Sequence, residues 1–404
     1  MINQGNKSLQ QNLRWLLLPV LFAFILLLTI LIHSALQQNM PGADFYIFWN
    51  AGKSFFIDRI NPYSLEVITQ NQLGILHRLA GSGKLNLAFA YPFYSLFGIL
   101  PNIFLSFDWA LSLSYAANLV WLICLLFWIF PEQKKLTSIS VFLLFPIVFG
   151  LVMGNFAIPI TLALLFFYGL IIQKGYRSTP IQAVSGVLLA WATLKPQFVW
   201  LLLIFALMYA WKNKLRPFLI AFFSGLAFLI ALSFALLPDW LTGWLHIMKA
   251  YAVYQQVNPA VFDLIQAVAP QPIVQGLGII ILALLAVVSI LLLVRWWKGK
   301  ETWLLVAAWL GMTTFLFHPH GMSYEQIPSL IPMILWMAMP GTSKSRTATA
   351  FWVITILLSW LPLFLRGNNP AIEKAPVLLI AVWITWLARQ NTGDDAQVSP
   401  VFTV

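Results

Sequence analysis

Few side chains in this chain could do chemistry, and one of them is an aspartate directly after the first apolar run. Asp44 lies two residues after Gly42, among aromatic residues, in the segment PGADFYIFWNAGK. A carboxylate at a membrane surface could act as a general base and take a proton from a substrate hydroxyl. The alternative role is an N-cap, since Asp is preferred at the start of a helix. The two roles do not exclude each other, and the sequence leaves both open.

A lysine stands between two apolar runs, in the segment TLKPQF. Lys195 at or near membrane depth is costly unless it has a partner or water. Pro196 is expected to end the preceding helix, which would leave the lysine near the outer surface. The side chain could simply snorkel to the interface. It could instead supply a cation that stabilises negative charge as that charge develops on a substrate.

A polar segment, FHPHGMSYEQIPSL, precedes one of the later apolar runs. Its members that could bind a substrate are His318, His320, Tyr324, Glu325 and Gln326. Two histidines with a nearby glutamate raise the question of zinc, but their spacing across a proline matches zinc-site patterns poorly. We therefore expect no metal here, and predict that the segment lines the polar outer mouth of a substrate cavity.

Two further residues each allow a structural and a functional interpretation. Gly154 and Asn155 form a turn signal, and Asn155 could also bind a substrate. Arg59 could meet a phosphate, although a charged loop residue most often faces solvent. The sequence contains no phosphate-binding P-loop, dinucleotide fingerprint or serine-nucleophile elbow. We therefore expect no cofactor.

The elements that must position these residues lie in a membrane. Of the 404 residues, 61% are hydrophobic and 9% are charged, whereas a soluble domain carries about 25% charged residues. This composition excludes a cytosolic enzyme, a nucleic-acid-binding module and a disordered protein. The apolar runs are too long for an outer-membrane barrel, in which apolar and polar residues alternate. The single cysteine, Cys124, excludes an intramolecular disulfide.

The apolar runs predict an all-α integral membrane protein with about twelve transmembrane helices. The runs lie near 14–35, 107–130, 137–153, 155–172, 181–195, 197–211, 217–237, 273–294, 302–317, 323–340, 348–366 and 371–388. A short run with two prolines, at 87–101, is interpreted as a re-entrant segment, and the sequence leaves open whether it crosses the membrane. Residues 1–404 are expected to form one polytopic domain, with a first outer loop at 36–86 and a second at 238–272. The first outer loop is expected to contain interfacial helices, one of them from Asp44 to Ile57.

The charges orient this topology. With these boundaries the inner loops hold fifteen basic and four acidic residues, and the outer loops hold eight of each. An excess of Lys and Arg marks the cytoplasmic side. We therefore expect a multi-pass protein of the cell membrane with both termini cytoplasmic. The long loops, and with them the active site, are expected on the outer face.

Several short motifs resemble glycosyltransferase family 87. They are ADFYIFWNAGK, Asn61-Pro62-Tyr63, YPFYSLFGILP, Gly154-Asn155 and Lys195-Pro196, and they occur in the family's order. Members of this family are integral-membrane enzymes of the GT-C fold that use a polyprenyl-phosphate sugar as the donor, and the resemblance implies the same for this chain. This chain departs from the family pattern where Phe93 follows Tyr91-Pro92 in place of a second proline.

The resemblance implies that a sugar, often mannose, moves from a polyprenyl-phosphate carrier to a lipid or glycan acceptor on the outer face. Asp44 matches the expected general base. The motif matches imply that Lys195, Asn155 and Tyr63 bind the donor phosphate or sugar. Arg59, which lies outside these motifs, could also meet the donor phosphate. The leaving group is a lipid phosphate that a protein cation could stabilise, so a metal is not clearly needed. No nucleic acid is expected as a partner.

A second departure concerns the Ser-Trp-x-His-like segment of the family. Here the corresponding residues run from Ser323 to Gln326, so the usual histidine is absent at that position. Whether His320 replaces it stays open, as do the identities of the sugar and acceptor, the carrier length and the oligomeric state. Two rival functions also stay open. A lipid or solute transporter or flippase would place charges near the bilayer midplane, and a non-catalytic scaffold would need no acid at position 44.

Overall fold

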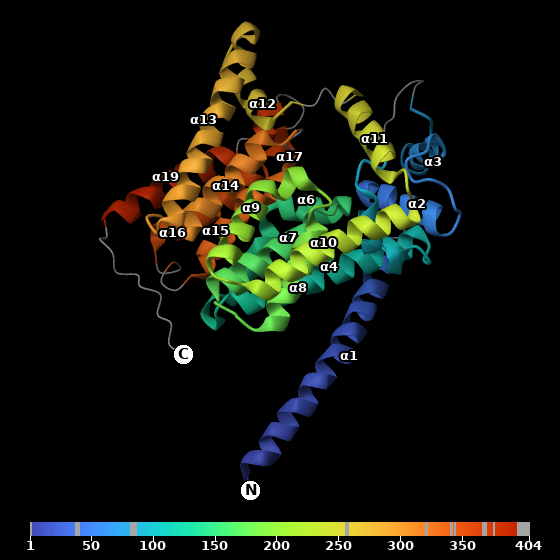
Figure 1. The fold of residues 1–404 in the computed structure, drawn as a ribbon, viewed down its shortest axis with the longest axis horizontal. Helices are drawn as coiled ribbons and strands as arrows, with labels where there is room; N and C mark the ends of the chain where they lie inside the picture. The colour runs from blue at the N-terminus through green and yellow to red at the C-terminus, as the bar shows by residue number, and fades with distance from the viewer. Residues whose placement is uncertain are drawn as a thin grey trace. The chain divides into compact units, whose positions relative to one another are not determined.

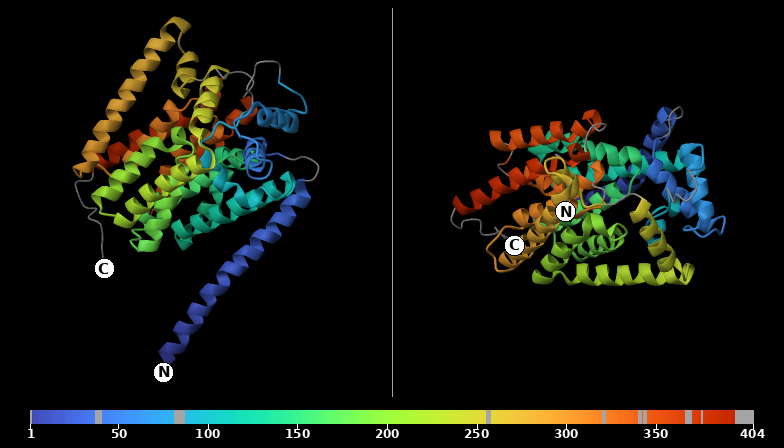
Figure 2. Two further views of the ribbon diagram at one scale, coloured as in Figure 1. Left: turned by 45° about the vertical axis from the view of Figure 1, so that its right-hand side comes forward. Right: turned by 90° about the horizontal axis from the view of Figure 1, so that it is seen from above.

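The computed structural model describes residues 2–36, 41–80, 87–254, 258–319, 322–339, 342, 345–365, 370–374 and 376–393. Within these residues the chain is helical and contains no strand, apart from one isolated bridge between Pro259 and Pro319 (Figure 1). Figure 2 shows the same helices from two further sides. An all-α architecture is therefore confirmed for the described part of the chain.

The helices belong to two compact units. Unit 1 comprises Met1–Cys124, Leu151–Asn155 and Leu237–Tyr254, and unit 2 comprises Leu125–Gly150, Phe156–Leu236 and Gln255–Val404. The α-helices of unit 1 are α1 (Ile2–Leu36), α2 (Ala43–Phe56), α3 (Leu65–Leu76), the first part of α4 (Phe107–Ile129) and α11 (Trp240–Tyr254). The prediction of a single domain for residues 1–404 stays a prediction.

Unit 2 contains most of the apolar helices. They are α5 (Lys135–Ile139), the first part of α6 (Phe145–Met153), α7 (Ala157–Leu165), the π-helix η5 (Phe166–Gln173), α8 (Thr179–Ala192), α9 (Pro196–Lys212), α10 (Arg216–Leu236), α12 (Ala260–Gln266), α13 (Gln271–Trp297), α14 (Trp303–Phe317), α15 (Ile327–Ala338), α16 (Arg346–Ser359), α17 (Leu361–Leu365), α18 (Pro370–Lys374) and α19 (Pro376–Gly393). The short helix η6 (Ser323–Gln326) precedes α15.

Every apolar run of the sequence contains helix, but the helices differ in length. Six segments of the described chain are long and apolar enough to cross a membrane: Pro19–Leu36, Phe107–Ile129, Arg216–Leu236, Gln271–Trp297, Arg346–Leu365 and Ala371–Arg389. A bent pair, Glu132–Leu143 with Phe145–Met153, makes up to seven. The remaining apolar helices are shorter, because breaks such as the one before Pro196 interrupt them. The count of twelve crossings stays a prediction.

The run at 87–101 forms no α-helix. It contains two short 3-10 helices, η1 (Phe93–Gly98) and η2 (Leu100–Asn102), and four residues of η1 are buried. A crossing helix needs about 20 residues, so this run does not form one. Its re-entrant placement stays a prediction.

Two helices of unit 2 pack in close contact. A Cβ atom added to Gly186 of α8 would lie 2.4 Å from the backbone oxygen of Phe218 in α10. Farther along, the Cβ of Ala190 lies beside Gly225. The contacts advance in the same direction along both helices, so α8 and α10 run parallel, and α9 connects them in the sequence.

Two lysines of the predicted cytoplasmic loops are hydrogen-bonded to helix C-termini within unit 2. Lys134 donates to the backbone oxygens of Met337 and Met339, at the end of α15. Lys212 donates to the backbone oxygen of Trp297, at the end of α13, over 2.7 Å. The last carbonyl groups of a helix lack intrahelical partners and carry partial negative charge. These two basic residues therefore stabilise helix ends, in addition to any role in setting the orientation of the chain in the membrane.

Candidate active site

The first functional candidate, Asp44, lies in the first turn of α2 in unit 1. The N-cap of α2 is Gly42, with a φ of 93° and no side-chain cap, so the capping role considered for Asp44 does not apply. An acidic residue in the first helical turn is stabilised by the positive end of the helix dipole. The side chain of Asp44 is half-buried.

The rest of α2 is held by aromatic packing within unit 1. A helix over Asp44–Ile57 was expected, and α2 matches it within one residue at each end. Phe45, Phe48 and Trp49 are buried, and the indole of Trp49 donates to the backbone oxygen of Leu105 over 3.2 Å. These rings therefore contact protein, and an interfacial position of α2 stays a prediction.

Asn155 holds the Asp44 carboxylate. Its Nδ2 donates a hydrogen bond to Oδ2 of Asp44 over 2.8 Å, across 111 positions of sequence. The asparagine is buried, at 3% exposure, so this contact is screened from water. The turn residue therefore orients the candidate base. The predicted role of Asn155 in binding a substrate stays a prediction.

The turn reaches α2 because residue 154 is glycine. Gly154 has a φ of 63°, and a Cβ there would lie 2.6 Å from the Cβ of Phe45. Both the left-handed conformation and the close approach require a residue without a side chain. The hydroxyl of Tyr115 on α4 donates to the backbone oxygen of Val152 over 2.6 Å and supports the same turn.

Tyr63 and Arg59 lie in the loop after α2. The hydroxyl of Tyr63 donates to the backbone oxygen of Tyr91 over 2.9 Å, which joins the Asn-Pro-Tyr motif to the Tyr-Pro motif. Burial raises the pKa of the Tyr63 phenol, so it stays protonated and keeps donating. Arg59 is exposed and has a φ of 60°. Their roles toward a donor stay predictions.

A second group of candidates lies in unit 2 and is centred on a buried ion pair. Nζ of Lys195, which precedes α9, lies 3.0 Å from Oε1 of Glu325 in η6, and their side chains are 3% and 6% exposed. The ammonium group also lies 4.9 Å from the ring centroid of Tyr324, a cation–π distance. Snorkelling to water therefore does not describe Lys195, because its charge is paired inside the protein.

The other carboxylate oxygen of Glu325 is also used. Oε2 lies 3.0 Å from Nδ1 of His318 and accepts the backbone N–H of Met322 over 2.9 Å. Glu325 is thus contacted by a lysine, a histidine ring and a backbone amide, so both oxygens of its buried carboxylate have partners.

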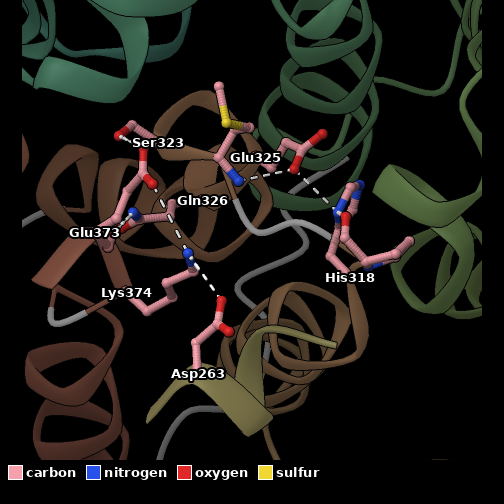
Figure 3. A network of polar contacts seen from close by, with 9 residues as sticks. Asp263, His318, Ser323, Glu325, Gln326, Glu373 and Lys374 are labelled. Atoms are coloured by element: carbon pink, nitrogen blue, oxygen red, sulfur yellow. Dashed lines mark hydrogen bonds and ion pairs between the residues drawn. The ribbon is translucent and has the colours of Figure 1, made fainter. Parts of the chain in front are cut away.

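The sequence did not predict a second network of polar side chains, which contacts η6. Ser323 and Gln326 of η6 both donate to Glu373, and Lys374 pairs with Asp263 (Figure 3). Gln326 was predicted to line a cavity, and the structure shows it bound to a backbone oxygen. The sequence showed only that the predicted outer loops contain many of the acidic residues, and this does not identify which residues of the network pair.

Among the described residues, no group of three or more His, Cys, Asp or Glu side chains is arranged to hold a metal ion. His320 lies outside the described residues, so the pair of histidines is not tested.

Comparison with known proteins identifies the family of the chain. The model of glycosyltransferase family 87 matches residues 89–319. No curated protein and no solved structure matches. The matched region includes Asn155, Lys195 and His318, whereas Asp44 precedes it and Glu325 follows it. Because the match covers more than half of the chain and the structure supplies long apolar helices, the protein belongs to glycosyltransferase family 87 and is a membrane glycosyltransferase.

Proposed function

We propose that the protein transfers a sugar, mannose, from a polyprenyl-phosphate carrier to an acceptor hydroxyl on the outer face of the cell membrane, with Asp44 as the general base. The observation that carries this proposal is the hydrogen bond from Asn155 to the Asp44 carboxylate in a chain of this family. A base must have a defined orientation to reach a substrate hydroxyl. Asn155 supplies that orientation from a buried position.

The proposed reaction is a single displacement at the anomeric carbon. The acceptor oxygen forms a bond to that carbon while the bond from the carbon to the phosphate oxygen breaks. The proton of the acceptor hydroxyl goes to the Asp44 carboxylate. The electron pair of the broken bond leaves with the polyprenyl phosphate, so negative charge grows on the phosphate during the step.

Lys195 is the residue that we assign to this phosphate. A fixed cation stabilises a leaving group most strongly when it lies in a site from which water is excluded, and Lys195 is 3% exposed. Its contact with Glu325 keeps the ammonium group charged and oriented. We assign Arg59 and Tyr63 to the donor headgroup as well. The side chains of the 318–326 segment, with His318 and Tyr324 foremost, are assigned to the acceptor or the cavity wall.

The test is transfer from a radiolabelled polyprenyl-phosphate mannose to lipid acceptors by purified protein in nanodiscs. Asp44→Asn keeps the size and the hydrogen-bonding capacity of the side chain but cannot take a proton. We expect it to lower kcat by about 10² to 10⁴, the usual contribution of a general base. Asp58→Asn is the matched control, because Asp58 is an exposed aspartate of the same loop.

Two results would overturn the proposal in different ways. Undiminished transfer by Asp44→Asn would remove Asp44 from the role of base. Absence of transfer by the wild type from any polyprenyl-phosphate sugar would refute the donor class. Movement of a labelled lipid between leaflets without transfer would favour the flippase alternative.

A further inference from the structure

Next to the Lys195–Glu325 pair, unit 2 contains a second buried cation that the proposed reaction does not use. Lys374 is the last residue of α18 and is 3% exposed; its Nζ lies 3.0 Å from Oδ2 of Asp263 in α12 and 3.7 Å from Oε2 of Glu373 (Figure 3). A buried lysine is costly unless it is paired. Lys374 therefore keeps α12 and α18 together and prevents repulsion between the two carboxylates.

Glu373 connects this cation to η6. The hydroxyl of Ser323 donates to Oε1 of Glu373 over 3.1 Å, and the side-chain amide of Gln326 donates to the backbone oxygen of Glu373. The two donors are the first and last residues of η6. They lie on either side of Tyr324 and Glu325 in the sequence, so α18 holds both ends of the turn that carries the partner of Lys195.

The helix α12, which pairs with Lys374 through Asp263, also contacts His318. The backbone N–H of Ala260, at the start of α12, donates to the backbone oxygen of His318 over 3.0 Å, and a bridge pairs Pro259 with Pro319. α12 therefore contacts His318 through its backbone and Lys374 through Asp263. The side chain of His318 in turn contacts Glu325.

These contacts form a closed ring. The ring runs from His318 to α12, from α12 to Lys374, from Lys374 through Glu373 to η6, and from Glu325 of η6 back to His318. Figure 3 shows the side-chain contacts of this ring. A closed ring determines the separation of α12 and η6, the two elements that hold His318. Removing the cation would leave two carboxylates facing each other and would open the ring.

We propose that Lys374 is a positioning residue for the donor phosphate, acting through Glu373 and η6 on the contact between Glu325 and Lys195. The inference rests on the proposed function, which assigns that phosphate to Lys195. Reactions that depend on orientation are sensitive to displacements of about 1 Å, which can cost about 10²-fold. The consequence of losing Lys374 is therefore weaker binding of the donor phosphate.

A matched control exists in the same unit. Lys134 is as buried as Lys374, at 4% and 3% exposure, and it donates to backbone oxygens at the C-terminal end of α15. It is therefore a buried structural lysine at the opposite end of the helix that follows η6. A generic loss of stability should appear in Lys134→Met and Lys374→Met alike.

The experiment uses the full chain in nanodiscs and compares Lys374→Met, Lys374→Arg and Lys134→Met. It measures the Kd for a polyprenyl phosphate without sugar, kcat and KM for the polyprenyl-phosphate sugar, and the midpoint of thermal unfolding. In Lys374→Met we expect Kd for polyprenyl phosphate to rise about tenfold and kcat to fall by a similar factor, because Lys195 stabilises charge that grows on the phosphate during the step. Lys374→Arg should restore binding, and Lys134→Met should lower the midpoint while keeping Kd within about twofold.

Ser323→Ala provides a second route if Lys374→Met does not fold. It removes only the hydroxyl that joins η6 to Glu373, leaves no unpaired charge, and should raise Kd in the same direction. Unchanged Kd in folded Lys374→Met, or in Ser323→Ala, overturns the inference, as does an equal rise in Lys134→Met. Failure of the folded wild type to bind polyprenyl phosphate overturns the proposed function instead, and the inference with it.

Discussion

Substitution of Glu325 by glutamine tests whether the buried ion pair with Lys195 is required for stability. The charged atoms lie 3.0 Å apart, and both side chains are at most 6% exposed. Two unit charges at that distance attract by about 5.5 kcal/mol at an effective dielectric constant of about 20. In the variant, Lys195 can lose its proton or be reached by water, and either change reduces the cost of losing this attraction. Removing one member of a buried pair costs about 3–5 kcal/mol, and we expect Glu325→Gln to lower the free energy of unfolding by that amount.

The double variant Lys195→Met/Glu325→Gln separates stability from activity. Because it leaves no unpaired lysine charge, it should recover part of the stability that Glu325→Gln loses. It should nevertheless transfer no sugar above background, since the proposed phosphate-binding cation is missing. Glu132→Gln is the matched control. It breaks an exposed pair with Lys135, in which Glu132 is 86% exposed, and it should cost less than about 1 kcal/mol.

The assay is reversible unfolding in mixed micelles, followed by the fluorescence of the 19 tryptophans and paired with the transfer assay. A free energy of unfolding for Glu325→Gln within about 1 kcal/mol of the wild type would refute the reasoning. The same conclusion would follow if the double variant were as unstable as Glu325→Gln, because the loss would then not arise from an unpaired charge.

Two further predictions concern unit 1. Asn155→Ala removes one hydrogen bond to Asp44; a bond to a charged group contributes about 1.5–3 kcal/mol, so kcat/KM in the transfer assay should fall at least about tenfold, and an unchanged value would contradict the orienting role. Tyr63→Phe should lower the free energy of unfolding at pH 7 by about 1 kcal/mol through loss of the bond to the Tyr91 oxygen. Because burial raises the pKa of Tyr63 in the folded state, its stabilisation is full below pH about 10 and is lost as pH rises further. The wild type should thus lose stability above that pH more steeply than Tyr63→Phe, in unfolding measured from pH 7 to 11, and parallel curves would be the contrary result.

Several local features of the fold were predictable from the chain. The helix near Asp44–Ile57, the break before Pro196 and a helix in each apolar run follow from local signals, namely glycine, proline and continuous hydrophobicity. The number of crossings was less predictable. α8 and α9 are shorter than a membrane-spanning helix, which needs about 20 residues. Contacts with other helices, such as the packing of Gly186 against α10, decide which faces of such short helices are buried in protein.

The candidate residues were also identified from the chain, but most of their partners were not. Lys195 and Glu325 were both singled out, yet their pairing crosses 130 positions, and the chain offers 12 acidic residues as partners. Lys374 and Asp263 were not singled out at all. A loop lysine most often faces solvent, and no local pattern distinguishes one that is 3% exposed.

The sequence by itself determined the class of environment, the helical elements and the residue types available for chemistry, because hydrophobicity and backbone preference act over a few neighbouring residues. Only the tertiary structure decided that Gly42 and not Asp44 caps α2, that Asn155 holds Asp44, and that the charges of η6, α12 and α18 close into a ring. The physical reason is that a buried charge is stable only beside a partner. That partner is supplied by whichever distant segment the packing of the helices brings within about 3 Å.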